Sequence, residues 1–266
     1  MNMKNHYIES DKKITSLKIY SDLAEITLSP GENSFLAGQF YILGIPGFGE
    51  APFTPTNFPN LQSISFLIRQ TGALTGRIFK CKVGDTLTLR GPYGKSFPFE
   101  KLKGKNIALA AGGCGLAPIK SALEYLVKNQ NDYGQIQLFY GVNTPSEISY
   151  KSDLARLKNK AEILISVAKP NKNYRGNVGF VDKLISKQTI LKNSAAILCG
   201  PPQMYDNVTK KLIGAGLNID DIYLQLERRM NCGMGLCQHC TCDTKYVCLD
   251  GPAFSYREIL KMNISI

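Results

Sequence analysis

The cysteines are the feature that most restricts how this chain can fold. Eight cysteines occur among 266 residues, and five of them lie in the last 35 residues. A secreted domain held by disulfides is usually shorter and spreads its cysteines more evenly. In a reducing compartment, such clustering more often indicates metal binding. We therefore expect the carboxyl-terminal part of the chain to fold around a metal.

The spacing within this cluster indicates which kind of metal site to expect. Cys232, Cys237 and Cys240 form the pattern C-x4-C-x2-C, and Cys248 follows them. This is the spacing of plant-type [2Fe–2S] sites, in which four thiolates hold the irons. A structural zinc site is the alternative, but zinc sites usually show two paired CxxC hooks, and this segment has one. We predict a [2Fe–2S] cluster on these four cysteines.

Two other residues of the segment are possible ligands. Cys242 is a fifth thiol, either a bystander or a competing ligand, and the spacing favours the cysteine two residues before it. His239 stands between two predicted ligands, but a Rieske centre needs two histidines. Its only companion is His6, near the amino terminus. Gly233 and Gly235 allow the backbone to curl around a cluster and aim amide groups at its sulfurs.

The first hundred residues have the pattern of a small all-β unit. Short apolar segments alternate with turns rich in Gly, Pro and Asn, which is typical of an antiparallel barrel or sandwich. The expected strands are Ile14–Tyr20, Ala24–Leu28, Gln39–Leu43, Ile64–Arg69 and Thr86–Leu89.

After Lys105 the pattern changes to alternating strands and helices, which indicates a parallel sheet covered by helices. The expected strands are Ile107–Ala111, Ile136–Tyr140, Glu162–Val167, Ala195–Cys199 and Asp221–Gln225. The expected helices are Pro118–Lys128, Lys151–Asn159, Gly179–Ser186 and Pro202–Ala215. We therefore divide the chain into an antiparallel β-barrel (residues 1–101), an α/β domain (102–226) and a small cysteine-rich segment (227–266).

Two glycine-containing turns follow buried strands of the α/β domain and precede helices. The first contains Gly112, Gly113, Gly115 and Pro118, and the second contains Cys199, Gly200, Pro201 and Met204. Such turns let backbone amides approach a pyrophosphate at a helix N-terminus. Two of them at the carboxyl ends of parallel strands form the usual nucleotide crevice. The first turn lacks the G-x-G-x-x-G order, and a purely structural turn and a core Cys199 are the alternatives.

Composition excludes several other classes of protein. The net charge is +11, but the lysines are spread along the chain, and no aromatic–basic motif of an RNA-binding module occurs. The apolar runs are too short to span a bilayer, and the first residues lack the apolar core of a signal peptide. We expect a cytoplasmic protein that does not bind nucleic acid or insert into membranes.

The chain resembles the ferredoxin–NADP reductase superfamily, in its branch of electron-transfer subunits, and the most specific stretch of the resemblance runs from Glu227 to Phe254. The electron-transfer subunit of anaerobic sulfite reductase and the sulfhydrogenase gamma subunit are the most similar branches, and the dihydroorotate dehydrogenase electron-transfer subunit is more distant. The resemblance covers residues 12–257. The gap of seven residues between Cys240 and Cys248 is similar to that of this branch. The resemblance implies the same four ligands and makes Cys242 a non-ligand.

The resemblance also implies FAD in the barrel. The segment Glu50-Ala-Pro-Phe-Thr54 is similar to the R-x-Y-S segment that lies along the isoalloxazine, with Ala51 at the Arg position. Arg69 or Arg77 is then expected to supply the missing charge. The segment Gly72-Ala-Leu-Thr75 resembles a flavin phosphate turn. The implied flavin contacts are Pro52, Phe53, Thr54, Arg69, Gly72, Leu74 and Thr75.

The function implied by the resemblance is oxidation of NAD(P)H at FAD and transfer of single electrons through the [2Fe–2S] cluster to a catalytic redox subunit of a heteromeric complex. Thr54 and Cys199 are the expected catalytic positions. Residues 142–147 contain no cation for a 2′-phosphate, which favours NADH. Anaerobic sulfite reductase is the first candidate for the complex, and a sulfhydrogenase or another hydrogenase or bifurcating complex is the alternative. A zinc-stabilised nucleotide-binding regulator is the alternative of another class.

Overall fold

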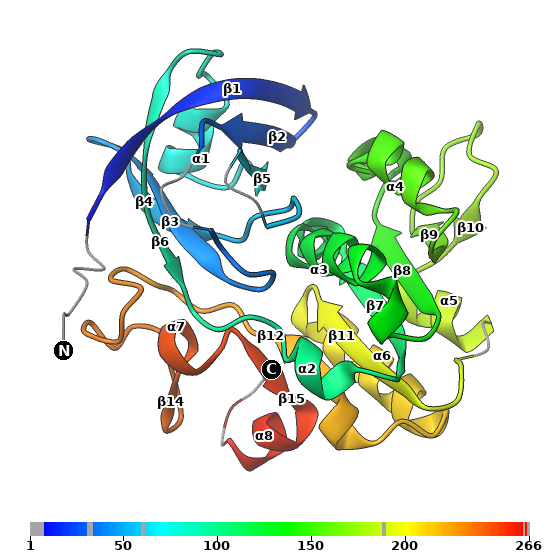
Figure 1. The fold of residues 1–266 in the computed structure, drawn as a ribbon. Coiled ribbons are helices and arrows are strands. Elements are labelled where there is room, and N and C mark those ends of the chain that lie inside the picture. Colours follow the sequence, from blue (N-terminus) through cyan, green and yellow to red (C-terminus); the bar gives the residue numbers. More distant parts are fainter. Residues whose placement is uncertain (1–7, 31–33, 60–61, 188–189, 263, 265–266) are drawn as a thin grey trace. The chain divides into compact units, whose positions relative to one another are not determined.

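The computed structural model describes residues 8–30, 34–59, 62–187, 190–262 and 264 (Figure 1). His6 lies outside these residues. The chain forms two compact units, one of residues 1–97 with 226–252, and the other of residues 98–225 with 253–266. The cysteine-rich segment therefore belongs to the same unit as the barrel. Its expected extent was to residue 266, whereas residues 253–266 belong to the α/β unit.

The first unit is built on a six-stranded antiparallel sheet in the order β4-β3-β6-β1-β2-β5. An isolated bridge between Pro55, after β4, and Phe66 of β5 joins the two edge strands, as in a barrel. All five strands predicted for this unit are confirmed, and β4 is an addition. The strands are β1 (Ser10–Tyr20), β2 (Leu23–Leu28), β3 (Phe40–Ile45), β4 (Gly49–Phe53), β5 (Ile64–Arg69) and β6 (Thr86–Tyr93).

The barrel core explains why these segments pair. Inward-facing residues of β2, such as Ile26 and Leu28, are fully buried, because alternate side chains of a strand point to the same face. Tyr41 of β3 and Phe66 of β5 meet edge to face, with ring centroids 6.3 Å apart. The short helix α1 (Ala73–Ile78) adds the buried Ile78 to this cluster.

The cysteine-rich segment folds as a compact loop within the first unit. It contains a two-stranded hairpin, β13 (Thr241–Cys242) with β14 (Lys245–Tyr246), and the short helix α7 (Val247–Asp250). The N–H of Leu226 donates to the Pro252 carbonyl oxygen at 2.9 Å, so the segment begins and ends at the same place. The N–H of Lys95, just after β6, donates to the Gly251 carbonyl oxygen at 2.6 Å and attaches the segment to the barrel.

The second unit contains a seven-stranded sheet in the order β10-β9-β8-β7-β11-β12-β15. All pairings are parallel except that of β15 with β12. The strands are β7 (Asn106–Gly112), β8 (Ile136–Val142), β9 (Glu162–Val167), β10 (Asn177–Val178), β11 (Ser194–Cys199), β12 (Ile222–Gln225) and β15 (Ala253–Ser255). The chain runs outward from β7 through β8 to β9 and then returns to β11 on the other side of β7. The strand order therefore reverses between β7 and β11, which is where ligands bind in doubly wound sheets.

The helices of this unit confirm the predicted alternation. They are α2 (Phe99–Leu102), α3 (Leu116–Lys128), α4 (Lys151–Leu157), α5 (Val181–Lys187), α6 (Pro202–Gly214) and α8 (Tyr256–Lys261). Single 3-10 turns are η1 (Gly113–Gly115), η2 (Gln130–Asp132), η3 (Pro145–Glu147) and η4 (Ile219–Asp221). Within the described residues, no helix has the length and apolarity needed to cross a bilayer.

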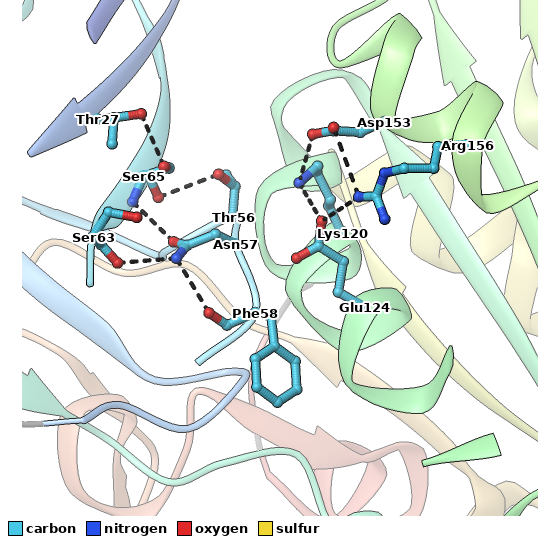
Figure 2. Close-up of polar contacts among 10 residues, drawn as sticks. All are labelled: Thr27, Thr56, Asn57, Phe58, Ser63, Ser65, Lys120, Glu124, Asp153 and Arg156. Carbon is cyan, nitrogen blue, oxygen red and sulfur yellow. Dashed lines mark hydrogen bonds and ion pairs between the residues drawn. The ribbon is translucent and has the colours of Figure 1, made fainter. Parts of the chain in front are cut away.

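A buried lysine fixes helix α3 to helix α4 (Figure 2). The Lys120 side chain is only 3% exposed, and its Nζ lies 2.7 Å from Glu124 and 3.1 Å from Asp153. Its ammonium also lies 4.6 Å from the ring centroid of Tyr150. A buried ammonium needs such partners, because desolvation without them is costly. This network gives α3, the helix that follows the first glycine turn, a fixed position in the unit.

Candidate functional site

The four predicted cluster ligands lie close together in the loop of residues 226–252. Cys232, Cys240 and Cys248 are buried, and Cys237 is partly exposed. The sulfurs of Cys240 and Cys248 are 3.2 Å apart. The N–H of Cys237 donates to the Cys232 sulfur at 3.4 Å, so these two residues also lie next to each other. A two-iron cluster needs two pairs of sulfurs, because each iron takes two protein sulfurs.

Backbone amides surround these sulfurs. The N–H of Met234 lies 3.4 Å from the Cys232 sulfur, and the N–H of Gly235 lies 3.1 Å from the Cys248 sulfur. Hydrogen bonds from backbone amides lower the pKa of Cys237 to about 6, whereas burial and the neighbouring Cys240 raise the pKa of Cys248 to about 12. The amide donors favour the thiolate form of these cysteines, whereas burial disfavours it. Several thiolates can therefore stay together in this interior only with a bound cation.

Two glycines give the loop its path. Gly233 and Gly235 have φ angles of +78° and +80°, in the left-handed region that residues with a Cβ atom rarely adopt. A Cβ atom at Gly233 would come within 2.7 Å of the Tyr93 ring, and one at Gly235 would overlap the Leu249 side chain. These glycines therefore give the loop the curled path expected from the sequence, and the N–H of Gly235 points to the Cys248 sulfur.

The two other possible ligands, Cys242 and His239, have different surroundings from the four predicted ligands. Cys242 is buried in the hairpin of β13 and β14, and within the part of the chain that the structure describes, no hydrogen bond joins its sulfur to the four ligand sulfurs. His239 is exposed. In the same described residues, no three His, Cys, Asp or Glu side chains have the arrangement of a single-ion site.

The segment expected along the flavin forms strand β4 and the loop after it. Pro52 and Phe53 pair with Ile42 and Tyr41 of β3, and Thr54 follows directly, half-buried. The Phe53 ring lies edge to face with Phe66, at a centroid distance of 6.4 Å. Phe53 therefore packs against the barrel core, and Pro52 and Thr54 flank it in the chain.

Hydrogen bonds hold the chain just beyond Thr54 (Figure 2). The Asn57 amide donates to the carbonyl oxygens of Ser63, at 3.0 Å, and Phe58, at 3.2 Å. Its Oδ1 accepts the N–H of Ser65 at 2.9 Å. The Thr56 hydroxyl donates to the Ser65 carbonyl oxygen at 3.2 Å. The loop is thus tied to β5, which restrains the position of the preceding hydroxyl.

The expected flavin phosphate turn is the start of helix α1. The Thr75 hydroxyl accepts the N–H groups of Thr71 and Gly72, each at 2.9 Å, so it caps this helix. Leu74 is buried in the barrel core. Both side chains are thus buried, and the exposed part of the turn is Gly72 and Ala73.

The two arginines expected to replace the missing flavin arginine both have partners in the barrel. Arg69 forms an ion pair with Asp22 at 3.3 Å and remains one third exposed. Arg77 lies over the Phe48 ring, 5.4 Å from its centroid. The sequence interpretation missed a third arginine, Arg90, whose buried guanidinium contacts the cysteine loop.

The two glycine turns of the α/β unit lie side by side at the point where the strand order reverses. A Cβ atom at Gly112 would lie 2.9 Å from both the Met204 sulfur and the Pro201 ring. A Cβ atom at Gly115 would overlap the Cys199 carbonyl oxygen. The turns therefore pack backbone against backbone, and only glycine permits this approach.

The groups around these turns are arranged for an anionic ligand. Helix α3 begins immediately after Gly115, so its first amides and its positive dipole end lie at this edge of the sheet. Pro118 occupies its first turn, as expected. The Tyr205 hydroxyl accepts the Gly200 N–H at 3.2 Å and donates to the Gln225 carbonyl oxygen at 2.5 Å. Tyr205, which the sequence interpretation missed, thus anchors the second turn.

Residues 142–147, the segment without a cation, comprise the last residue of β8 and the capped turn that follows it. The Glu147 carboxylate accepts the N–H and the hydroxyl of Thr144, at 3.1 and 3.0 Å. The hydrogen bonds of the Glu147 carboxylate are therefore made within its own turn.

Comparison with known proteins agrees with this architecture. Residues 109–210 match the oxidoreductase NAD-binding domain, and residues 227–260 match the iron–sulfur cluster binding domain of dihydroorotate dehydrogenase B. Sulfhydrogenase 2 subunit gamma of Pyrococcus furiosus is 36% identical over 95% of this chain and 92% of its own length. The chain belongs to the family of electron-transfer subunits that includes the sulfhydrogenase gamma subunits.

Solved structures share the fold of this chain. The NADH-dependent reduced ferredoxin–NADP oxidoreductase, studied for flavin-based electron bifurcation, superposes with a TM-score of 0.77 at 22% identity, covering 94% of this chain and 91% of its own. A ferredoxin–NADP⁺ reductase of Neisseria gonorrhoeae with bound FAD and NADP gives a TM-score of 0.71 at 21% identity, covering 81% of this chain and 97% of its own. The predicted antiparallel barrel and parallel-sheet domain are therefore confirmed, and the chain is an oxidoreductase subunit with NAD-binding and iron–sulfur domains.

Proposed function

We propose that this chain oxidises NAD(P)H and delivers the electrons one at a time, through FAD and a [2Fe–2S] cluster, to a catalytic subunit of a larger complex. The observation that carries this proposal is the grouping of the four cysteines, with the Cys240 and Cys248 sulfurs 3.2 Å apart and backbone amides donating to the sulfurs of Cys232 and Cys248, within the same compact unit as the barrel. A bound flavin would supply the conversion between two-electron and one-electron chemistry. The chain's own residues bind and orient the redox groups and exclude water.

The fit of the barrel to FAD rests on β4 and the residues around it. Pro52, Phe53 and Thr54 would face the ring system, with the Thr54 hydroxyl held in place by the loop that Asn57 ties down. The exposed backbone at Gly72 would face the diphosphate. The FAD-bound reductase of similar fold supports this assignment.

The nucleotide would bind across the two glycine turns. Amides of the first turn and the N-terminus of α3 suit a pyrophosphate. Cys199, at the carboxyl end of β11, would shape the pocket of the nicotinamide, and Tyr205 keeps the turn after it in place. NADH remains the expected donor, because residues 142–147 offer no cation to a 2′-phosphate.

The cluster would be held by Cys232, Cys237, Cys240 and Cys248. Amide donors to these sulfurs favour the more negative, reduced form, and thereby raise the reduction potential. Burial of three of the four sulfurs keeps water away from the cluster.

Two candidate partners follow from the family. Anaerobic sulfite reductase is the first candidate from the sequence. A hydrogenase-type catalytic subunit is the second, and the 36% identity to sulfhydrogenase 2 subunit gamma favours it. Co-purification of the chain from native extract under anaerobic conditions, followed by identification of the bound catalytic subunit, would decide between them. Recovery of the chain with neither type of subunit would contradict both candidates.

The redox role itself is tested on the anaerobically purified chain. Its visible spectrum should show flavin bands and charge-transfer bands of a [2Fe–2S] cluster, and stopped-flow mixing with NADH should bleach the flavin bands faster than mixing with NADPH. A colourless zinc protein would indicate the nucleotide-binding regulator instead. A large preference for NADPH would overturn only the choice of nucleotide.

A further inference from the structure

Arg90 has an unusual position for a charged side chain of a barrel strand. It lies on β6, and its side chain is only 3% exposed. Buried guanidinium groups require partners for their donors, because desolvation of an unpaired charge is costly. The partners of Arg90 come from strand β4, from the cysteine loop and from β6 itself.

The first partner is Glu50, at the start of β4. The Arg90 guanidinium makes a two-pronged contact with this carboxylate, from Nη2 to Oε1 at 2.5 Å and from Nε to Oε2 at 3.2 Å. Two parallel hydrogen bonds of this kind fix the orientation of the planar guanidinium group as well as its distance from the carboxylate. Strand β4 continues into Pro52, Phe53 and Thr54, the expected flavin segment.

The second partner is the backbone of the cysteine loop. Arg90 Nη1 donates to the Cys232 carbonyl oxygen at 2.6 Å, and Nη2 donates to the Asn231 carbonyl oxygen. These are the carbonyl groups of the first predicted ligand and of the residue before it. The guanidinium also lies 5.9 Å from the ring centroid of Tyr93, the ring that Gly233 packs against.

We propose that Arg90 is a positioning residue that holds the first ligand loop of the cluster against the flavin strand, and that the Arg90–Glu50 pair sets the local charge felt by the cluster. This inference rests on the proposed function, because it presupposes a cluster on Cys232. It deepens that function by naming the connection within the chain between the flavin strand and the cluster loop.

The two charges have opposite effects on the cluster. Reduction adds a negative charge to the cluster, so a nearby cation makes reduction easier and a nearby anion makes it harder. Arg90 is more deeply buried than Glu50, whose side chain is 38% exposed, so the cation is the less screened of the two charges. Loss of Glu50 should raise the potential, and loss of Arg90 should lower it by a larger amount.

The test is the midpoint potential of the cluster in the complete, anaerobically purified chain, measured by redox titration with EPR detection. Four variants are compared with the unmodified protein: Glu50→Gln, Arg90→Gln, Arg90→Lys and Glu25→Gln. Glu25→Gln is the matched control, because it removes the same charge from β2, which does not pair with β4 or β6. Iron and acid-labile sulfide are measured in every sample.

We expect Glu50→Gln to raise the potential, Arg90→Gln to lower it, and Glu25→Gln to leave it unchanged. Arg90→Lys keeps the positive charge but loses the two-pronged hydrogen bonding of the guanidinium group. Its cluster potential should therefore lie between those of Arg90→Gln and the unmodified protein, nearer to the latter. If Arg90→Gln does not retain a cluster, the midpoint potentials of Glu50→Gln and Arg90→Lys test the inference. Unchanged potentials in iron-replete Glu50 and Arg90 variants would overturn the inference, whereas absence of iron from the unmodified protein would overturn the proposed function itself.

Discussion

Gly115 packs so tightly against Cys199 that a Cβ atom at Gly115 would overlap the Cys199 carbonyl oxygen. The same atom would lie 2.9 Å from the Gly200 nitrogen. One turn follows β7 and the other follows β11, so this contact joins the two halves of the doubly wound sheet at the point where its strand order reverses. We therefore expect nucleotide binding to depend on this contact.

Gly115→Ala should force the two turns apart. We expect about 1–3 kcal/mol of lost unfolding free energy from overpacking, and an increase of about tenfold or more in the dissociation constant for NADH. Gly214→Ala is the control, because a Cβ atom there meets nothing within 4 Å. NADH titrations of flavin reduction check this prediction, and equal affinity in both variants would contradict it.

Cys199→Ala should slow reduction of the flavin by NADH without loss of iron. The sulfur is buried at the end of β11, and removing it leaves a small void where the nicotinamide is expected, so the donor is held less well. We expect a decrease on the order of tenfold in the stopped-flow rate, as for a misplaced reactant. Cys81→Ala, in the barrel, is the control. Equal losses of rate and of iron in the Cys199 variant would argue against this role.

Cys242→Ala should retain the cluster, whereas Cys240→Ala should lose it. Both sulfurs are buried, but only that of Cys240 lies beside another predicted ligand, Cys248. The cavity in Cys242→Ala should cost about 1–2 kcal/mol of stability. Iron and acid-labile sulfide analysis of both variants checks this. Loss of iron from Cys242→Ala with retention in Cys240→Ala would reverse the ligand assignment.

Gly233→Ala should impair cluster assembly more than Gly47→Ala does. The two glycines have nearly the same φ angle, +78° and +81°, so the backbone strain of about 1–2 kcal/mol is shared. Only the first substitution also brings a Cβ atom within 2.7 Å of the Tyr93 ring, because a Cβ atom at Gly47 meets nothing within 4 Å. The fraction of chains that acquire iron during anaerobic reconstitution is the measurement. Equal fractions would show that the Tyr93 contact has no part in assembly.

The regular strands and helices were predictable because their signals are local. The alternation in Ala24–Leu28 and the buried run Ala195–Cys199 identify β2 and β11 without reference to the rest of the chain. Strand β4 was missed because Gly49–Phe53 contains a proline and a charged residue and shows no alternation. It is nevertheless a strand, because it pairs along β3 at the edge of the sheet.

The site was predictable only where its residues are close in sequence. The cysteine spacing and the glycine turns indicate their chemistry directly. Arg90 and Cys232 are separated by 142 positions, so no spacing rule connects them. Tyr205 and Gln225 are likewise joined only by the fold. The turn at Gly72 resembled a phosphate site, but which groups Thr75 would bind depends on side-chain geometry that the sequence does not contain.

The most direct test of the electron-transfer account is metal, sulfide and flavin analysis of the chain purified without oxygen, followed by anaerobic addition of NADH. We predict roughly two irons and two acid-labile sulfides per chain, stoichiometric flavin, and an EPR signal of a reduced cluster after NADH is added. Zinc without iron or labile sulfide, in protein that NADH does not reduce, would contradict the account.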